Sequence, residues 1–210
     1  MQISEIFYSI QGEGVNIGKP AIFIRLNLCD LRCVWCDSKY TWRKEFGKEM
    51  TIEKIIKEIK KYPAKHLVIT GGEPLIQQKE LINLLKKLGD YFIEIETNGT
   101  IQPLEELTKL INQYNCSPKL KNAKTKNREL KKFPAEKTYY KFVVERKKDI
   151  DEIKKIMKTL DKEKIILMPQ GTTKKNLAKT SKLLAEICKK ENLRFTPRLH
   201  MEIWGNKRKK

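Results

Sequence analysis

The regular alternation of short strand-like runs with amphipathic helical runs most constrains how this chain can fold. Runs rich in β-branched and aromatic residues are AIFIRLN (21–27), HLVIT (66–70), YFIEIET (91–97), YYKFVV (139–144) and KIILMP (164–169), with RFTPRL (194–199) as a last strand. Helical patterns lie between them near 51–61, 78–88, 103–113, 149–159 and 174–190. This alternation predicts an α/β fold with a mostly parallel sheet, either doubly wound or closed partway into an open barrel.

Length and composition indicate one domain. The 210 residues suit a single unit spanning 1–210, in which 206–210 (NKRKK) form a basic, solvated tail. The N-terminus lacks the features of a signal peptide, and no apolar run reaches the roughly 18 residues of a membrane helix. We therefore expect a cytoplasmic protein, and in that reducing compartment clustered cysteines bind metal or do chemistry more often than they form disulfides.

The formal charge of +19 favours anionic ligands. Much of the charge lies on helix faces where Lys alternates with Glu or Asp, which is typical of solvated surface. Segment 119–132 carries seven Lys and Arg against one Glu, and we predict an exposed loop there. No nucleic-acid-binding motif accompanies the charge, so direct nucleic-acid contact is not expected. Thr51 is a predicted helix N-cap, and Asp149 with Glu152 resembles a capping box.

Unusual residues follow the predicted strands. The cysteine loop CDLRCVWCD (29–37) comes after the first strand, and GGEP (71–74) and TNGT (97–100) come after the next two. CSPK (116–119) and PQGTT (169–173) occupy similar places further on. Because the carboxyl ends of parallel strands meet at one edge of a sheet, we expect these loops to build the functional site together.

The three cysteines of the loop, Cys29, Cys33 and Cys36, point to a metal site with one open position. A structural zinc site is normally closed by four Cys or His ligands, and the other cysteines and histidines are far along the chain. An iron–sulfur cube held by three thiolates leaves one iron free for a small molecule. A zinc site with a remote fourth ligand, or three unrelated core cysteines, are the alternatives.

CxxxCxxC with Trp35 before the third cysteine resembles the signature loop of the radical S-adenosylmethionine (SAM) enzymes. The resemblance implies a 4Fe-4S cluster on the three cysteines and SAM on the fourth iron, where reductive cleavage gives a 5′-deoxyadenosyl radical. GGEP stands where that family has its SAM-binding glycines. The implied fold is a partial, open parallel β/α barrel with about six core strands and reduced helices.

Other motifs narrow the resemblance to the 7-carboxy-7-deazaguanine synthase family. EIFYSIQGEG (5–14), CDSKYTW (36–42), ETNGT (96–100) and LHMEIWGNKR (199–208) are similar to that family's sequences, and together they span nearly the whole chain. The resemblance implies conversion of 6-carboxy-5,6,7,8-tetrahydropterin to 7-carboxy-7-deazaguanine with ring contraction and loss of ammonia. The radical removes the hydrogen at C6, and SAM is regenerated. A lyase, a homodimer and a reducing electron donor such as flavodoxin or ferredoxin are also implied.

A carboxylated pterin needs a cation and paired polar groups in its pocket. Arg25 lies in an otherwise apolar strand, where an anionic partner would offset its burial; that partner is either the substrate carboxylate or a structural ion pair. Glu13 can accept hydrogen bonds from the guanidine-like pterin edge, and the Thr70 hydroxyl and His200 can reach the same space. The predicted substrate-binding residues are Ile10, Gln11, Gly12, Glu13, Arg25, Thr70 and His200.

The resemblance also assigns the remaining ligands. A hydroxyl at the position of Ser38 ligates Mg²⁺ in the family, where many members have Thr, and Mg²⁺ prefers such oxygen ligands. The residues implied for SAM are Trp35, Cys36, Asp37, Gly72, Glu73, Asn98, Ser117, Pro118, Lys119, Met168, Pro169, Gln170 and Gly171. The ending MEIWGNKRKK departs from members whose chain stops soon after the histidine and contacts substrate with its terminal carboxylate, so that contact is not transferred to Lys210.

Two other functions are compatible with parts of the pattern. A radical SAM activase of a glycyl-radical enzyme or of anaerobic ribonucleotide reductase would share the cysteine loop but not need Arg25 and the QGEG turn. A zinc-binding nucleic-acid module would use the cysteines and the charge, and would bind RNA or DNA in a salt-dependent way.

Overall fold

The computed structural model describes residues 1–210. The strands are β1 (Gln2–Ile10), β2 (Pro20–Leu26), β3 (Lys48–Glu49), β4 (His66–Gly71), β5 (Phe92–Thr97), β6 (Gln113–Cys116), β7 (Thr138–Val144), β8 (Ile165–Pro169) and β9 (Arg194–Phe195). The α-helices are α1 (Ile52–Ile59), α2 (Gln78–Leu85), α3 (Glu105–Leu110), α4 (Asp149–Met157), α5 (Lys174–Glu191) and α6 (Leu199–Trp204). Short 3-10 turns occupy several of the connections.

All nine strands form one open sheet in the order β3-β1-β2-β4-β5-β6-β7-β8-β9. From β2 to β9 every neighbouring pair is parallel, whereas β1 pairs antiparallel with β2 and β3. Six of the parallel strands, β2 and β4 to β8, thus make a barrel that is not closed. Several helices are short, and none of the α-helices lies between β6 and β7. The predicted open parallel barrel with about six core strands and reduced helices is confirmed.

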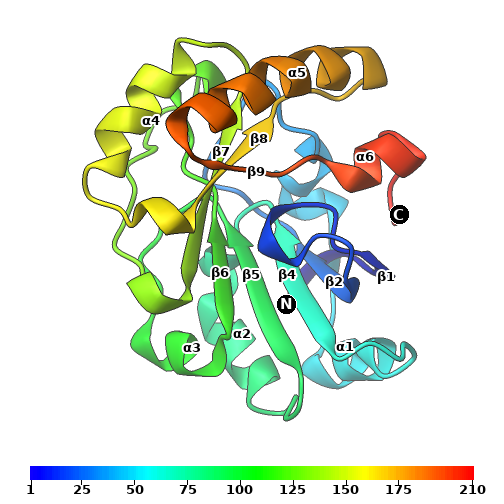
Figure 1. Ribbon diagram of the computed structural model, residues 1–210. Coiled ribbons are helices and arrows are strands. Elements are labelled where there is room, and N and C mark those ends of the chain that lie inside the picture. Colours follow the sequence, from blue (N-terminus) through cyan, green and yellow to red (C-terminus); the bar gives the residue numbers. More distant parts are fainter.

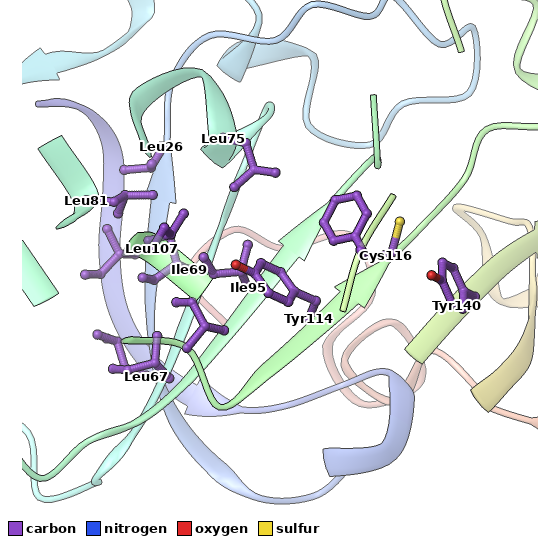
Figure 2. Packing of buried hydrophobic residues seen from close by; sticks show 14 of the residues in the cluster. Leu26, Leu67, Ile69, Leu75, Leu81, Ile95, Leu107, Tyr114, Cys116 and Tyr140 are labelled. Atoms are coloured by element: carbon purple, nitrogen blue, oxygen red, sulfur yellow. The ribbon is translucent and has the colours of Figure 1, made fainter. Parts of the chain in front are cut away.

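The sheet separates an apolar face from a polar one because side chains alternate along each strand. Figure 1 shows α1 and α2 behind the sheet and the N-terminal turn, in blue, in front of it. The helix-covered face holds the main hydrophobic core, to which Leu26, Leu67, Ile69, Ile95 and Tyr114 contribute from successive strands (Figure 2). The opposite face lines the inside of the partial barrel, where the strands present polar side chains such as Arg25, Thr70 and Glu96 beside a small apolar cluster of Phe7, Ala21, Phe23 and Val68.

Most predicted elements lie within two or three residues of the observed ones, but some details differ. Strands β1, β3 and β6 were not predicted: the alternation over residues 2–10 was not assigned to a strand, β3 has only two residues and β6 only four. The expected strand 194–199 ends at Phe195, and Leu199 already begins α6, so His200 lies in a helical turn. Pro197 interrupts the strand, because a proline cannot donate to the sheet ladder.

Of the two predicted helix starts, one is right. The Thr51 hydroxyl accepts from the backbone N–H of Lys54, 3.4 Å away, as an N-cap should. The capping box at Asp149 is wrong: Lys148 is the cap residue, and the Asp149 carboxylate instead accepts from the backbone N–H groups of Glu145 and Arg146. The carboxylate therefore stabilises the loop before α4.

The basic segment 119–132 is only partly exposed. Asn122 and Ala123 are buried, and Arg128 pairs with Glu152 of α4. The terminal tail is exposed, yet the Arg208 guanidinium contacts the Glu5 carboxylate at 3.2 Å. Both segments therefore make ion pairs with the rest of the domain, which their basic composition alone did not indicate. None of the helices has both the length and the apolar character needed to cross a membrane.

Candidate active site

An open cavity lies on the polar face of the sheet, where the carboxyl ends of the parallel strands meet the cysteine loop. All but four of the predicted site residues line it: Ile10, Gln11, Gly12, Glu13, Arg25, Cys29, Cys33, Trp35, Cys36, Asp37, Ser38, Thr70, Gly72, Asn98, Ser117, Lys119, Met168, Gln170 and His200. The four that lie outside the lining are Glu73, Pro118, Pro169 and Gly171. The fold thus gathers residues predicted from five separate loops around one space.

Sequence reasoning missed several residues of the lining: Phe7, Phe23, Leu31, Trp42, Gly71, Glu96, Thr97, Asn115, Lys141, Val143, Arg198 and Lys210. Two of them carried a readable signal. Lys141 is a charged residue inside the apolar run YYKFVV, so the argument made for Arg25 applies to it equally. Glu96 shares a face with Glu94, because residues two apart in a strand point the same way, and two glutamates on one buried face call for cationic or amide partners.

The three thiols of the cysteine loop are free and lie in one small apolar cluster. Cys33 is buried against Leu31 and Ala123, and Cys29, Cys36 and Trp35 pack against that group. Burial raises the pKa of Cys29 to about 12, so this thiol is protonated at neutral pH when no metal is bound. Metal binding must therefore displace protons from the loop.

The thiols do not converge on one point. No group of three or more His, Cys, Asp or Glu side chains is arranged to hold a single metal ion. Sulfurs bound to one zinc ion would all lie about 2.3 Å from it. In a cube each thiolate takes a different iron, so the sulfurs stay further apart. Three cysteines from one loop supply the thiolates that a 4Fe-4S cluster with one open iron needs, whereas a structural zinc ion needs a fourth Cys or His.

The glycines of GGEP let the end of β4 approach the cysteine loop. A Cβ on Gly71 would lie 2.3 Å from the Leu26 carbonyl oxygen, and one on Gly72 would lie 2.1 Å from that of Leu28. Gly71 also has a φ of +149°, which L residues rarely adopt. The pair of glycines therefore serves backbone packing as well as ligand access.

Glu73 is fully buried behind the cavity wall. Its carboxylate accepts from the Leu75 N–H, the Thr97 hydroxyl and the Asn98 N–H at 2.7 to 3.0 Å. Burial nevertheless dominates and raises the pKa of Glu73 to about 7. Through these contacts the side chain holds the end of β5 in place.

This burial predicts a pH-dependent stability. The folded state retains the Glu73 proton between pH 4.5 and about 7, where the unfolded state releases it. The free energy of unfolding of the cluster-free protein should therefore fall by about 3 kcal/mol as pH rises through this window. In Glu73→Gln this decrease of the unfolding free energy with pH should be absent, as measured by urea unfolding at pH 5, 6, 7 and 8. If the unfolding free energy of both proteins changed with pH in the same way, the raised pKa of Glu73 would be contradicted.

Arg25 is paired with Glu5 on the neighbouring strand. Its Nε donates to the Glu5 carboxylate at 2.9 Å, and the same carboxylate accepts from the Tyr40 hydroxyl and from Arg208. The structural ion pair that the sequence left open is therefore present. The two Nη groups of Arg25 donate to no protein acceptor, and the side chain is 20% exposed on the cavity wall. They remain available to an anionic ligand.

Glu13 lies at the centre of a charged cluster. One carboxylate oxygen accepts from Lys141, whose side chain is nearly buried, and the other accepts from Arg198 Nε at 3.0 Å. Burial alone would raise the pKa of Glu13, but Lys141 and Arg198 outweigh it and hold that pKa well below the ordinary value. Glu13 is therefore ionised and acts only as a hydrogen-bond acceptor.

Amide and hydroxyl groups complete this side of the cavity. The Gln11 amide donates to Glu94 at 2.6 Å and to Glu96 at 3.3 Å, while the Thr70 hydroxyl donates to Glu96 at 2.8 Å. His200 packs on Gly12 so closely that a Cβ there would lie 2.2 Å from its Nδ1. Burial lowers the pKa of His200, so the ring is neutral at neutral pH and can both donate and accept.

The segment after the third cysteine carries a linked pair of oxygens. The Ser38 hydroxyl donates to one oxygen of Asp37 at 2.9 Å, and the other oxygen accepts from Arg198. Desolvation alone would raise the pKa of Asp37, but the positive charge of Arg198 outweighs it and lowers that pKa below the ordinary value. The carboxylate therefore stays ionised. Ser38 and Asp37 both face the cavity and could together offer hard oxygen ligands to Mg²⁺.

The opposite wall comes from the β6 and β8 ends. Lys119 Nζ donates to the carbonyl and hydroxyl oxygens of Ser117 at 2.7 and 2.9 Å and lies 5.9 Å from the Trp35 ring centre. Trp35 in turn donates its Nε1–H to Asn122 at 3.3 Å. The Asn98 amide, from the β5 end, donates to Asp30 at 2.9 Å. The loops that follow β5 and β6 are therefore joined directly to the cysteine loop.

Comparison with known proteins agrees with this geometry. Residues 23–166 match the model of the radical SAM superfamily. The 7-carboxy-7-deazaguanine synthase of Pyrobaculum aerophilum is 37% identical over all of this chain and 97% of its own length. That of Aquifex aeolicus is 35% identical over 94% of this chain and 91% of its own. The crystal structure of QueE from Escherichia coli superposes with a TM-score of 0.76 at 31% identity, covering 95% of this chain and 94% of that one.

Proposed function

Because the chain belongs to the 7-carboxy-7-deazaguanine synthase family of the radical SAM superfamily, we propose that it makes 7-carboxy-7-deazaguanine from 6-carboxy-5,6,7,8-tetrahydropterin. The reaction contracts the ring and releases ammonia, which makes the enzyme a carbon–nitrogen lyase. The observation that carries the proposal is one cavity lined both by the three-cysteine loop and by the charged side chains of Arg25 and Glu13. None of these relatives supports the activase or the zinc-module alternative.

Membership of the superfamily implies a 4Fe-4S cluster and SAM, and the residues present fit both. Cys29, Cys33 and Cys36 would hold the cluster. When bound, the cluster and SAM supply the radical that removes the C6 hydrogen atom of the substrate. The chain itself contributes the glycine-lined backbone around Gly72, the Ser117–Lys119 segment and the β8 end as the walls against which SAM would lie.

The substrate end of the cavity follows from complementary chemistry. The free Nη groups of Arg25 suit a carboxylate, which a guanidinium binds in a bidentate way. The ionised Glu13 suits the N–H donors of the pterin edge, and neutral His200 and Thr70 suit its mixed donors and acceptors. Fixing the flat ring at both ends would point its C6 at the cysteine-loop side, and such positioning accounts for much of the rate of enzymes.

We also propose Mg²⁺ at Ser38. The Ser38 hydroxyl faces the cavity next to an ionised carboxylate, and Mg²⁺ is commonly held by one or two protein oxygens with waters and substrate oxygens completing the shell. A homodimer remains a prediction of the family resemblance.

The electron donor is the remaining partner, and we propose that it docks on the basic segment next to the cysteine loop. The Ala123 carbonyl accepts from the Val34 N–H at 3.0 Å, so this segment lies directly against the loop. Lys121, Lys124 and Lys126 are exposed there. This charge would attract an acidic one-electron donor such as flavodoxin or ferredoxin, in a salt-dependent way.

Reversing charge at this surface should slow reduction without harming the site. Lys124→Glu with Lys126→Glu should lower the rate of flavodoxin-driven turnover by about tenfold at low salt. Turnover with dithionite should be unchanged. Lys54→Glu with Lys57→Glu, on exposed positions of α1, is the control of equal charge. If flavodoxin-driven turnover slowed equally in the two double variants, docking at this surface would be contradicted.

The proposed function is tested by anaerobic reconstitution with iron and sulfide, followed by incubation with the carboxylated tetrahydropterin, SAM, Mg²⁺ and dithionite. The expected result is 7-carboxy-7-deazaguanine, identified by mass spectrometry, with many turnovers per SAM. A protein that carries about four irons and cleaves SAM but forms none of this product would reject the assignment.

A further inference from the structure

Arg198 is a buried cation that no part of the family assignment above uses. It is 7% exposed and lies at the end of the irregular segment between β9 and α6. A buried guanidinium is costly unless its donors are satisfied. Each of its three guanidinium nitrogens, Nε, Nη1 and Nη2, donates a hydrogen bond, and each donates to a different part of the cavity wall.

The three contacts of Arg198 join segments that are far apart in the sequence. Nε donates to the Glu13 carboxylate at 3.0 Å, and Nη1 donates to the Gly171 carbonyl at 2.8 Å. Nη2 donates to the Asp37 carboxylate, which in turn accepts from Ser38. One planar fork therefore fixes the substrate-side carboxylate, the turn after β8 and the end of the cysteine loop relative to one another.

The backbone around Arg198 strengthens this connection. The Leu199 N–H donates to the Gly12 carbonyl at 2.9 Å, and the Thr196 hydroxyl accepts from the Gly14 N–H at 2.9 Å. The turn that carries Glu13 is thus held on both sides by the segment that carries Arg198. Lys141 holds the second oxygen of Glu13, so the carboxylate has no freedom to rotate towards solvent.

We propose that Arg198 is a positioning residue that sets the orientation of Glu13 towards the N–H edge of the substrate and aligns it with the Asp37–Ser38 end of the cysteine loop. This inference rests on the proposed function. Arg198 faces a cavity proposed for an anionic substrate, yet all of its hydrogen bonds go to protein acceptors. The proposal explains this, because these hydrogen bonds orient the Glu13 carboxylate. Arg25 is left as the cation that meets the substrate carboxylate.

The test compares the substrate with an analogue in which hydrogen replaces its 2-amino group. Wild-type protein, reconstituted and bound to SAM, should bind the substrate roughly 30-fold more tightly than the analogue, because the analogue cannot donate a hydrogen bond to the ionised Glu13 carboxylate. With SAM at a saturating concentration, Arg198→Met should reduce this ratio by at least about tenfold while iron content and the circular dichroism spectrum stay as in wild type. Glu13→Gln should reduce the ratio similarly. Arg194→Met, at an exposed position of β9, should leave it unchanged.

Arg198→Lys provides a second measurement if the methionine variant does not fold. An ammonium group lacks the planar fork and cannot hold three separate acceptors, so the ratio should fall to an intermediate value with iron retained. If the ratio of substrate affinity to analogue affinity were unchanged in any folded Arg198 variant, the proposal would be overturned. A variant that lost iron and bound substrate and analogue equally more weakly would also overturn it. Wild-type protein that binds neither compound would instead reject the proposed function.

Discussion

Replacing Cys29, Cys33 or Cys36 with alanine should reduce iron to a small fraction of the wild-type content and product formation to background. Each thiolate would hold a separate iron of the cluster, and the loop has no fourth cysteine to replace a lost one. Iron determination, the absorption spectrum near 400 nm and turnover measure the effect.

The matched controls are the other two cysteines. Cys116 and Cys188 are both buried in the main core, away from the cysteine loop's own cluster. Replacing either with alanine should cost about 1 kcal/mol of stability through lost packing but leave iron and turnover intact. Loss of iron in either variant would mean that the cluster uses a fourth protein ligand, and the position assigned to SAM would then be closed.

Arg25→Ala should weaken substrate binding by about 30-fold or more and leave iron and SAM cleavage intact. Truncating one partner of a desolvated charged pair typically costs about 2 kcal/mol or more. Glu5 keeps Tyr40 and Arg208 as partners, so the strand pair should survive the change. Equilibrium binding of the substrate to the SAM-bound, unreduced protein measures the effect.

Glu5→Gln separates the two roles of Arg25. This variant removes the carboxylate charge from the ion pair but keeps Arg25 itself, so substrate affinity should change by less than about threefold. Arg43→Ala, with a side chain that is 68% exposed, is the control for loss of one positive charge and should have no effect. If Glu5→Gln weakened binding as much as Arg25→Ala, Arg25 would be a structural residue.

The sequence predicted the strand and helix order well because long periodic segments carry their own signal. Strand β7 and helix α5 are examples, since apolar spacing over seven and eighteen residues leaves little ambiguity. Strand β6 was missed because four residues, QYNC, show no usable period. Its pairing with β5 and β7 comes from tertiary contacts that no local pattern reveals.

The site was predicted best where a motif brings several residue types together and worst where single charges act through tertiary contacts. The cysteine loop and the QGEG turn were read directly. Lys141 and Arg198 were not predicted as site residues, because their common partner Glu13 lies 128 and 185 residues away in the sequence. The support that Glu73 gives to the end of β5 could not be read from GGEP, because it depends on burial and on the Asn98 N–H, 25 residues further along the chain.

The central claim is that one cavity places the C6 hydrogen of a carboxylated tetrahydropterin beside the radical source held at the three-cysteine loop. The most direct measurement is turnover of substrate carrying deuterium at C6, with mass analysis of both product and SAM. Deuterium should leave the product and appear in the SAM pool, because SAM is regenerated with a hydrogen from the substrate. Product formed without deuterium in SAM, or deuterium released only to solvent, would contradict the account.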